Sequence, residues 1–419
     1  MSDSSHSSPR FRVRDLLVLF EQALFSIGNL GASILAARWF PQSDYGAFAA
    51  GVGLLFLIGG FHTAVISEPL QVFGVQRFRY RFRLYLKVVL VGHTIFVLTF
   101  GIGLIISGWV AHQLSADDLA NALWGLAFAQ AGMLSFWLSR RTCYTRNAER
   151  LALEGSVLYV LLVLSGFLFA QSSLALTPFT AFVIVGSVAA VLSFYQVASL
   201  WRTASEPSGT LLVRDVWRAH KDYGRWSSVN VALYWGSGQI IVLLVPAWFG
   251  LAASAGLAAM TNLFRPISLL IQAISLKLIP YLAGLYARSK NERPDNAVLP
   301  LSVFVGLGTA LYAFSVWIGG DRLISIVYRT DYREYSNLLS LLGAGAVVSV
   351  LASVYQASLK AQGRVKDVTV AYAISFVTFA ILVAPAGLAF GLRGLLGASV
   401  VSYAAFACVI LWRHREVAA

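Results

Sequence analysis

Residues 88–110 read VVLVGHTIFVLTFGIGLIISGWV, an apolar run in which His93 is the only ionisable side chain. A helix needs about 20 apolar residues to cross roughly 30 Å of bilayer hydrocarbon. Runs of similar length recur along the whole chain, whereas the strands of a membrane β-barrel are alternating segments of ~10 residues. The sequence therefore predicts an all-α polytopic membrane protein.

Composition supports a membrane-embedded surface. Of the 419 residues, 58% are hydrophobic and only 12% are charged, whereas soluble chains carry roughly 25% charged residues. So few charges cannot cover a surface that faces water. We predict about twelve transmembrane helices, which cover residues 16–38, 45–66, 88–110, 119–139, 152–171, 177–199, 226–249, 252–275, 299–319, 336–358, 368–389 and 393–412.

Basic residues give these spans an orientation, because cytoplasmic loops of membrane proteins are enriched in Lys and Arg. With a cytoplasmic N-terminus, 25 of the 32 Lys and Arg residues lie in inside segments and five lie in outside loops. We therefore expect a multi-pass protein of the cytoplasmic (inner) membrane with both termini in the cytoplasm. Orientation and anionic membrane lipid account for the net charge of +13, so no nucleic-acid partner is expected.

An internal repeat indicates two lobes. Gly28-Asn29 in the first span corresponds to Gly238-Gln239 in the seventh, and Trp39-Phe40 corresponds to Trp248-Phe249. Six spans preserve the side of the membrane, so the halves would be parallel repeats. We predict two parallel six-helix lobes, with a tail at 1–15, an N-lobe at 16–199, a linker at 200–225, a C-lobe at 226–412 and a tail at 413–419.

Arg265 is the most informative charge within a span, because ionisable groups in the bilayer are costly and usually face a cavity or a partner. It lies far from both predicted ends, and Pro266 should kink the helix and free a backbone carbonyl. We interpret Arg265 as an anion-binding residue of an aqueous cavity. The alternative is a structural arginine that snorkels or pairs with a carboxylate. Lys277, near the inner end, is a weaker candidate because snorkelling lysines are ordinary there.

Three carboxylates lie toward the cytoplasmic side of the spans: Glu21, Glu68 and Glu154. Each could face a cavity and bind a coupling proton or sodium ion, or could stabilise a helix interface. His62 and His93 are more typical of packed, hydrogen-bonded histidines than of proton relays.

Motifs for enzymatic chemistry are missing from the sequence. No lysine follows a glycine, so there is no Walker A loop, and no HExxH, CxxC or EF-hand spacing occurs. Cys143 and Cys408 support neither a disulfide framework nor a metal cluster. The longest predicted outside loop, 320–335, is short for a catalytic domain. We expect no catalytic residue, metal or cofactor.

Three stretches carry a family resemblance. Residues 36–46, AARWFPQSDYG, resemble the signature that follows the first span of polysaccharide-transport proteins. These are oligosaccharide flippases of the multidrug/oligosaccharidyl-lipid/polysaccharide (MOP) exporter superfamily. Residues 320–332 and the segment LKAQGRVK at 359–366 are similar to the C-terminal half of that family. Arg329 departs from the family, which usually has glycine in that turn.

The resemblance implies a flippase that moves a polyprenyl-diphosphate-linked oligosaccharide across the membrane by alternating access, for cell-surface polysaccharide biosynthesis. Partners would be this lipid-linked substrate, membrane lipid, a coupling proton or sodium ion, and polysaccharide assembly enzymes. A deep arginine suits the diphosphate, since it replaces lost hydration of the phosphates. The candidate substrate-binding residues are Arg265, Lys277, Asn29 and Gln239.

Three other functions remain open. A drug or organic-cation antiporter of the same superfamily would favour an acidic, aromatic site over a deep arginine. A membrane enzyme of polymer assembly, such as a ligase or polymerase, would need larger outside loops. A non-catalytic subunit of a polysaccharide assembly complex is the third alternative.

Overall fold

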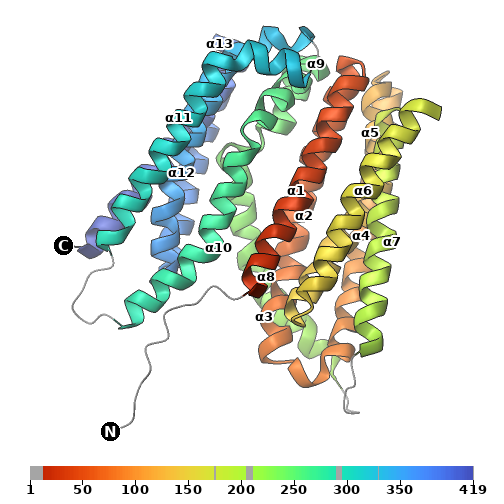
Figure 1. Cartoon of the computed structure of the whole chain (residues 1–419), viewed down its shortest axis with the longest axis vertical. Helices are drawn as coiled ribbons and strands as arrows, with labels where there is room; N and C mark the ends of the chain where they lie inside the picture. Colours follow the sequence, from red (N-terminus) through yellow and green to blue (C-terminus); the bar gives the residue numbers. More distant parts are fainter. Residues whose placement is uncertain (1–12, 174–175, 204–210, 289–294, 329, 419) are drawn as a thin grey trace.

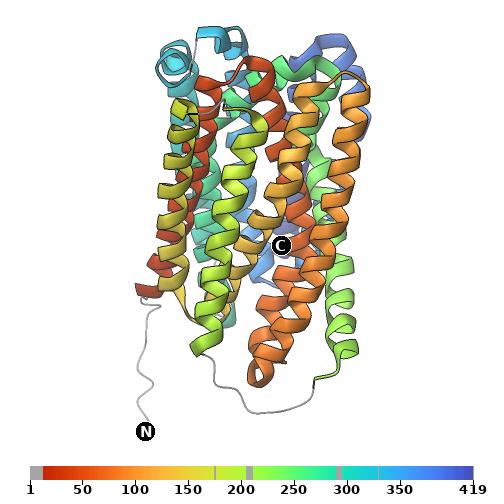
Figure 2. The same ribbon diagram turned by 90° about the vertical axis from the view of Figure 1, so that its right-hand side faces the viewer.

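The computed structural model describes residues 13–173, 176–203, 211–288, 295–328 and 330–418. These residues are almost entirely helical, and none of them forms a strand. A helix pairs its own backbone N–H and C=O groups, for which hydrocarbon offers no hydrogen-bond partner. The long helices run along the long axis of the molecule (Figures 1 and 2). The predicted all-α fold with two six-helix lobes is confirmed.

The N-lobe lies on the right in Figure 1. Helix α5 is its centre and packs against α2, α4 and α7, while α1 packs against α6. Its elements are α1 (Val13–Trp39), α2 (Gln42–His62), the π-helical turn η1 (Thr63–Ser67), α3 (Glu68–Gln76), the 3-10 helix η2 (Arg79–Arg81), α4 (Phe82–Gln113), α5 (Asp117–Thr145), α6 (Glu149–Ser173) and α7 (Pro178–Thr203).

The C-lobe lies on the left in Figure 1, and α12 packs against α10, α11 and α13. Its elements are α8 (Val213–Tyr234), the π-helical turn η3 (Trp235–Gln239), α9 (Ile241–Leu263), α10 (Arg265–Arg288), α11 (Asp295–Val327), the 3-10 helix η4 (Thr330–Leu338), α12 (Leu339–Ala361) and α13 (Val365–Ala418).

Two long helices each contain a break in their helical geometry. Gly250 in α9 and Gly391 in α13 have non-helical backbone angles with positive φ. Ten helical segments of the described chain are long and apolar enough to cross a membrane. The segment 241–263 contains Gly250, and the segment 365–416 contains Gly391. Gly250 and Gly391 each divide one of these ten segments, so twelve helical stretches correspond to the roughly twelve predicted spans.

The start of the seventh crossing differs from the prediction. We expected a linker over 200–225, but α7 ends at Thr203 and α8 begins at Val213. Residues 213–225 are polar enough to be excluded from a predicted span, yet one side of them is apolar. Val216 and Ala219 on that side are buried, and α8 packs against α3 and α4 of the N-lobe. Tertiary packing therefore extends the helix below the hydrophobic span.

The eighth crossing breaks where Pro266 predicts a kink. Helix α9 ends at Leu263, Phe264 has non-helical backbone angles and α10 starts at Arg265. Pro266 has no N–H for the carbonyl four residues before it, that of Asn262. The neighbouring carbonyl of Leu263 accepts a 2.7 Å hydrogen bond from the hydroxyl of Tyr312. The predicted kink beside Pro266 is confirmed.

A row of glycines on α2, which we call the glycine seam, forms a close contact between the lobes. Gly46, Gly53 and Gly60 recur every seven residues, so they lie near one face of the helix. A Cβ atom at Gly46 would lie 1.8 Å from the carbonyl oxygen of Leu251, and one at Gly53 would lie 2.7 Å from Val242. Small residues allow this close approach in membranes, where hydrophobicity does not drive helices together.

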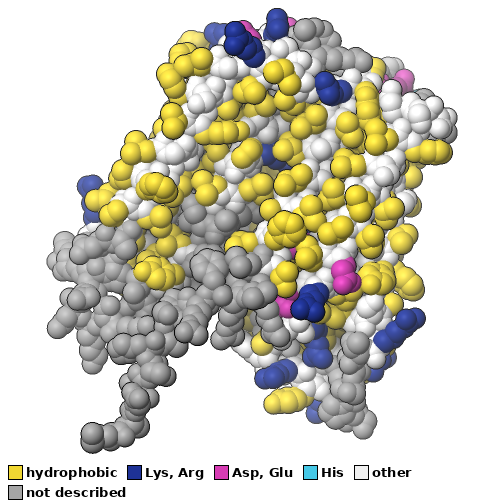
Figure 3. Space-filling model, in the orientation of Figure 1, with side chains coloured by type: hydrophobic (Ala, Val, Ile, Leu, Met, Phe, Trp, Pro, Cys, Tyr) yellow, Lys and Arg dark blue, Asp and Glu magenta, His cyan; other side chains and the backbone are white. Residues whose placement is uncertain are grey.

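The outer surface agrees with a membrane setting. Hydrophobic side chains cover much of the middle of the face shown in Figure 3. Lys and Arg side chains gather mainly toward its upper and lower ends. Large apolar side chains on the outward faces of α4 and α11, such as Ile102 and Leu311, are more than half exposed, which suits contact with lipid.

Candidate functional site

Arg265 lies at the boundary between the lobes in a polar cluster of four side chains. Its Nε donates a 3.2 Å hydrogen bond to Oδ1 of Asn262. Nδ2 of Asn262 donates to Oγ of Ser33 at 3.0 Å and to the hydroxyl of Tyr45 at 3.1 Å. Ser33 on α1 and Tyr45 on α2 belong to the N-lobe, so Ser33, Tyr45, Asn262 and Arg265 form an interlobe cluster.

The guanidinium of Arg265 keeps free donors. Among the described residues no carboxylate lies within ion-pair distance of it, and its two terminal nitrogens have no hydrogen-bond partner. The side chain is half-buried. A planar guanidinium with two adjacent N–H edges can bind a carboxylate or phosphate in a bidentate manner. The cluster can therefore hold an anion between the lobes.

Tyr45 of this cluster packs with two further tyrosines. The ring of Tyr45 lies 6.0 Å from that of Tyr332, and Tyr332 lies 5.8 Å from Tyr328. The buried hydroxyl of Tyr328 has no hydrogen-bond partner in the described part of the chain. A buried polar group without a partner is costly, so this hydroxyl is suited to a ligand or an ordered water.

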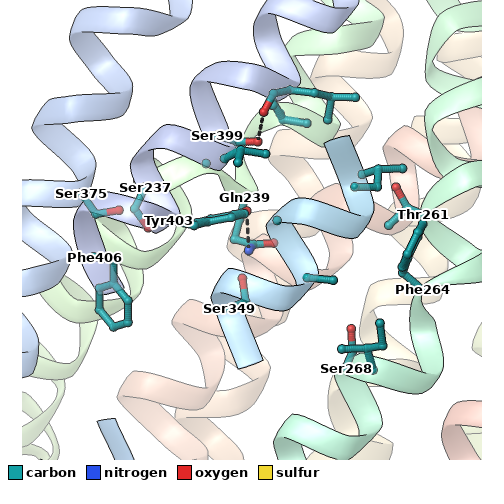
Figure 4. Close-up of a pocket in the computed structure, with 18 of the residues that line it drawn as sticks. Ser237, Gln239, Thr261, Phe264, Ser268, Ser349, Ser375, Ser399, Tyr403 and Phe406 are labelled. Atoms are coloured by element: carbon teal, nitrogen blue, oxygen red, sulfur yellow. Dashed lines mark hydrogen bonds between the residues drawn. The ribbon is translucent and has the colours of Figure 1, made fainter. Parts of the chain in front are cut away.

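Gln239 lines a cavity of about 400 Å³ inside the C-lobe (Figure 4). Residues of α9, α10, α12 and α13, of the π-helical turn η3 and of the end of α8 line it. Nε2 of Gln239 donates a 3.0 Å hydrogen bond to the hydroxyl of Tyr403. The described residues that line the cavity are all uncharged. Its polar lining residues are Tyr234, Ser237, Gln239, Thr261, Ser268, Ser349, Ser353, Gln356, Tyr372, Ser375, Ser399 and Tyr403.

The cavity adjoins the interlobe cluster. Phe264 and Ile267 line it, and Arg265 lies between them in the sequence but does not line it. Its volume falls in the range of about 300–1,000 Å³ that is typical of small-molecule sites. Hydroxyl and carboxamide groups beside aromatic rings suit a neutral ligand that carries many hydrogen-bonding groups.

The structure does not bring all four predicted substrate-binding residues together. Asn29 lies within the N-lobe, where it donates to the carbonyl of Phe25 at 2.8 Å and accepts from the hydroxyl of Tyr159 at 3.0 Å. The side chain of Lys277 lies outside the described residues. Arg265 and Gln239 are therefore the two that the structure places beside an interlobe site and a cavity.

The three predicted ion-coupling carboxylates have different surroundings. Glu21 is fully buried in an ion pair with Arg140, whose Nε and Nη2 donate at 2.5 and 2.8 Å. Tyr144 and Ser156 also donate to it. Burial with this set of donors suits a structural carboxylate of the N-lobe.

Glu68 and Glu154 lie elsewhere. Glu68 begins α3 and accepts a 2.7 Å hydrogen bond from Ser227 on α8, so it joins the two lobes near their lower end. Glu154 is exposed on α6. Of the three carboxylates, Glu68 is the one that a relative movement of the lobes would directly disturb.

Sequence reasoning missed the partners of Arg265. Asn262 precedes it by three residues, and helical spacing could have linked the two. Ser33 and Tyr45 are more than 200 residues away in the chain, and Tyr328 follows α11. Uncharged polar residues are common in such a chain, so their participation emerges only when the two lobes are packed together.

Solved structures match the chain over nearly its whole length. Lipid II flippase MurJ in an inward closed conformation gives a TM-score of 0.72 at 13% identity, covering 95% of this chain and 87% of its own. An inward-facing multidrug resistance MATE family transporter of the MOP superfamily gives 0.76 at 12% identity, covering 95% and 97%. The chain has the MOP transporter fold. No family model and no curated protein matches it.

A third match concerns pocket chemistry. A MOP superfamily transporter from Pyrococcus furiosus, described by the reverse polarity of its binding pocket, gives a TM-score of 0.68 at 12% identity. It covers 96% of this chain and 93% of its own length. At such identities the likeness shows the MOP fold alone. The ligand of this chain must therefore be argued from its own residues.

Proposed function

We propose that this protein is a flippase for a polyprenyl-diphosphate-linked oligosaccharide. The observation that carries the proposal is Arg265, a guanidinium between the lobes with no described carboxylate partner. A diphosphate offers the planar, doubly hydrogen-bonding anion that such a side chain binds best. The polyprenyl chain would stay in the bilayer while the headgroup occupies the interlobe region.

The neighbouring cavity supports the sugar half of this proposal. Its uncharged lining of hydroxyls, carboxamides and aromatic rings suits a neutral saccharide and offers no carboxylate to an organic cation. Thr261, Ser268 and Ser349 have hydroxyls without a hydrogen-bond partner among the described residues, so they can contact a ligand. An antiporter of organic cations would need a negative charge here.

The energy for net transport must come from outside the chain, because the sequence contains no Walker A loop. A membrane potential supplies ~2.3 kcal/mol per charge for each 100 mV. A gradient of protons or sodium ions is the other source, and Glu68 is the carboxylate best placed to sense it. The placement of Glu21 in an ion pair favours a structural role.

Orientation follows from the distribution of basic residues. We propose an inner-membrane protein with both termini in the cytoplasm. Reporter domains fused after Ser205, Asn291 or Gln362 should report the cytoplasm, and fusions after Gln113 or Arg329 should report the outside. Reversed signals from the three fusions beyond residue 225 would contradict the parallel arrangement of the lobes.

The decisive experiment replaces Arg265. We expect Arg265→Ala to abolish export of the surface polymer and to leave lipid-linked precursor on the inner leaflet. Loss of a charge-assisted contact of roughly 1.5–3 kcal/mol weakens binding by one to two orders of magnitude. Arg265→Lys should retain part of the activity, because it keeps the charge but loses the bidentate geometry.

Arg333→Ala is the matched control, since Arg333 is an exposed arginine of η4 outside the interlobe cluster. It should export normally. Normal export by Arg265→Ala would contradict the proposal, and so would a loss explained by unfolded protein. If Arg265→Ala instead changed only the resistance of cells to organic cations, the antiporter alternative would be supported.

A further inference from the structure

Two histidines meet inside the N-lobe. Nε2 of His62 lies 2.9 Å from Nδ1 of His93, and Nε2 of His93 lies 2.9 Å from Oγ of Ser135. Oγ of Ser67 lies 3.4 Å from Nδ1 of His62. These four side chains come from α2, η1, α4 and α5. His62 is fully buried and His93 is nearly so.

The position of each proton follows from one serine. Ser135 donates its hydroxyl proton to the carbonyl of Ala131 at 2.7 Å, so its oxygen must accept from His93. His93 therefore carries its proton on Nε2 and accepts at Nδ1. His62 must then donate from its own Nε2, which leaves Nδ1 of His62 as an acceptor.

One ring nitrogen of the four thus remains free to take a proton. Nδ1 of His62 has only the 3.4 Å contact with Ser67, which is too long for a strong hydrogen bond. The other three ring nitrogens are each engaged at 2.9 Å. Both imidazoles are neutral in this arrangement, and a single added proton would bind at Nδ1 of His62.

The site lies where α2 changes its helical geometry. His62 is the last residue of α2, and Ser67 ends the π-helical turn η1, directly before α3. π-Helical turns inside α-helices are frequent at functional sites. The same turn faces the C-lobe, because Nδ1 of His220 on α8 lies 3.0 Å from the carbonyl oxygen of Val65.

The charged groups around the pair are few. Arg141 on α5 donates to Gln71 on α3 at 2.9 Å and acts electrostatically on His62. Glu68 on α3 follows Ser67 and acts on Arg141. His93 on α4, His220 on α8 and Tyr85 on α4, whose hydroxyl lies 2.7 Å from Nε2 of His220, are further titratable groups packed here. None of them is a carboxylate in contact with His62.

We propose that Nδ1 of His62 is a proton-binding site that couples proton uptake to the bending of α2. The added proton bonds to Nδ1, and the hydroxyl of Ser67 turns so that its oxygen accepts the new N–H. The resulting charge is buried without a carboxylate, which is costly. Proton binding therefore favours a state in which η1 moves toward water, and the contact of η1 with α8 carries that movement to the C-lobe.

This inference deepens the proposed function by naming a coupling ion and its site, and it rests on that function only for its physiological role. The site itself can be tested on the protein alone. The chain has six histidines, so ¹⁵N-histidine labelling gives few signals in NMR spectra of the purified protein in lipid nanodiscs. His62→Gln and His93→Gln variants assign the two signals of the pair.

We expect both histidines to carry their proton on Nε2 at high pH and one titration, at Nδ1 of His62, as pH falls. Spin labels at residues 113 and 333, in a Cys408→Ser background, should report a pH-dependent distance across the lobes. This change should vanish in His62→Gln and persist in His112→Gln, an exposed histidine beside Asp117. His93→Gln should shift the titration midpoint and keep the titration at His62.

A proton on Nδ1 of His62 at high pH, or titration at His93 first, would overturn the proposal even if His62→Gln failed to fold. An unchanged pH response in folded His62→Gln would also overturn it. These results are independent of the Arg265 experiment. Normal export by Arg265→Ala would remove the flippase proposal and leave the proton site standing.

Discussion

At the scale of single residues, the sequence identified the unusual charges but not their partners. Arg265 stood out because of its depth and its proline neighbour, and the structure places it between the lobes. Glu21 stood out equally, yet it lies in an ion pair with Arg140, which follows directly after the predicted span 119–139. Which carboxylate meets which arginine depends on helix packing, because the two residues are 119 positions apart.

The ion pair with Arg140 allows a test of whether Glu21 has a structural role or binds a coupling ion. We expect Glu21→Gln to lower the unfolding temperature of the detergent-purified protein, because it leaves Arg140 charged and buried without a counter-ion. Breaking a buried pair costs about 3–5 kcal/mol. The matched change at the exposed Glu154, Glu154→Gln, should leave the unfolding temperature unchanged. A stable Glu21→Gln protein that had lost its dependence on an ion gradient would instead assign coupling to Glu21.

At the scale of elements, hydrophobic runs predicted the crossings but not their irregular turns. The sequence anticipated the break before Pro266, since proline has a fixed effect on a helix. It did not anticipate the π-helical turns η1 and η3, because neither contains a residue that demands one. Packing against the other helices determines where these π-helical turns form. Both turns lie beside groups that we propose to bind a proton or a sugar.

Gly238 in η3 offers a prediction for this scale. Its φ is 126°, and a Cβ atom there would lie 3.1 Å from Cβ of Ser399 and 3.2 Å from the ring of Tyr403. We expect Gly238→Ala to destabilise the C-lobe and to disturb the hydrogen bond between Gln239 and Tyr403, since side chains rarely adopt this conformation. The unfolding temperature and the export rate should both decrease.

Gly397→Ala is the matched control, because Gly397 is helical in the same region and a Cβ atom there meets nothing within 4 Å. It should be neutral or slightly stabilising, since alanine favours helices by about 1 kcal/mol over glycine. Equal stability of Gly238→Ala and the parent protein would show that η3 tolerates a regular helix.

At the scale of the whole molecule, the internal repeat predicted two lobes, and the fold confirms them. Their contact could not be predicted, because the repeat says nothing about the angle between the halves. The glycines of α2 were visible in the sequence, yet a heptad of glycines also suits packing within one lobe. Only the positions of Leu251 and Val242 show that the seam faces the C-lobe.

The glycine seam has a consequence for the speed of transport. Side chains that interlock must change rotamer whenever two helices shift, which raises the activation barrier of the shift. A glycine surface has no such side chains, so the lobes can change their angle at little cost, and turnover should be fast. We expect Gly53→Ala to lower the maximal export rate several-fold while the substrate concentration for half-maximal rate stays constant. Gly103→Ala, with open space around its Cβ position, should leave both quantities unchanged. If Gly53→Ala changed only the substrate concentration for half-maximal rate, the seam would act on binding and not on the rate of movement.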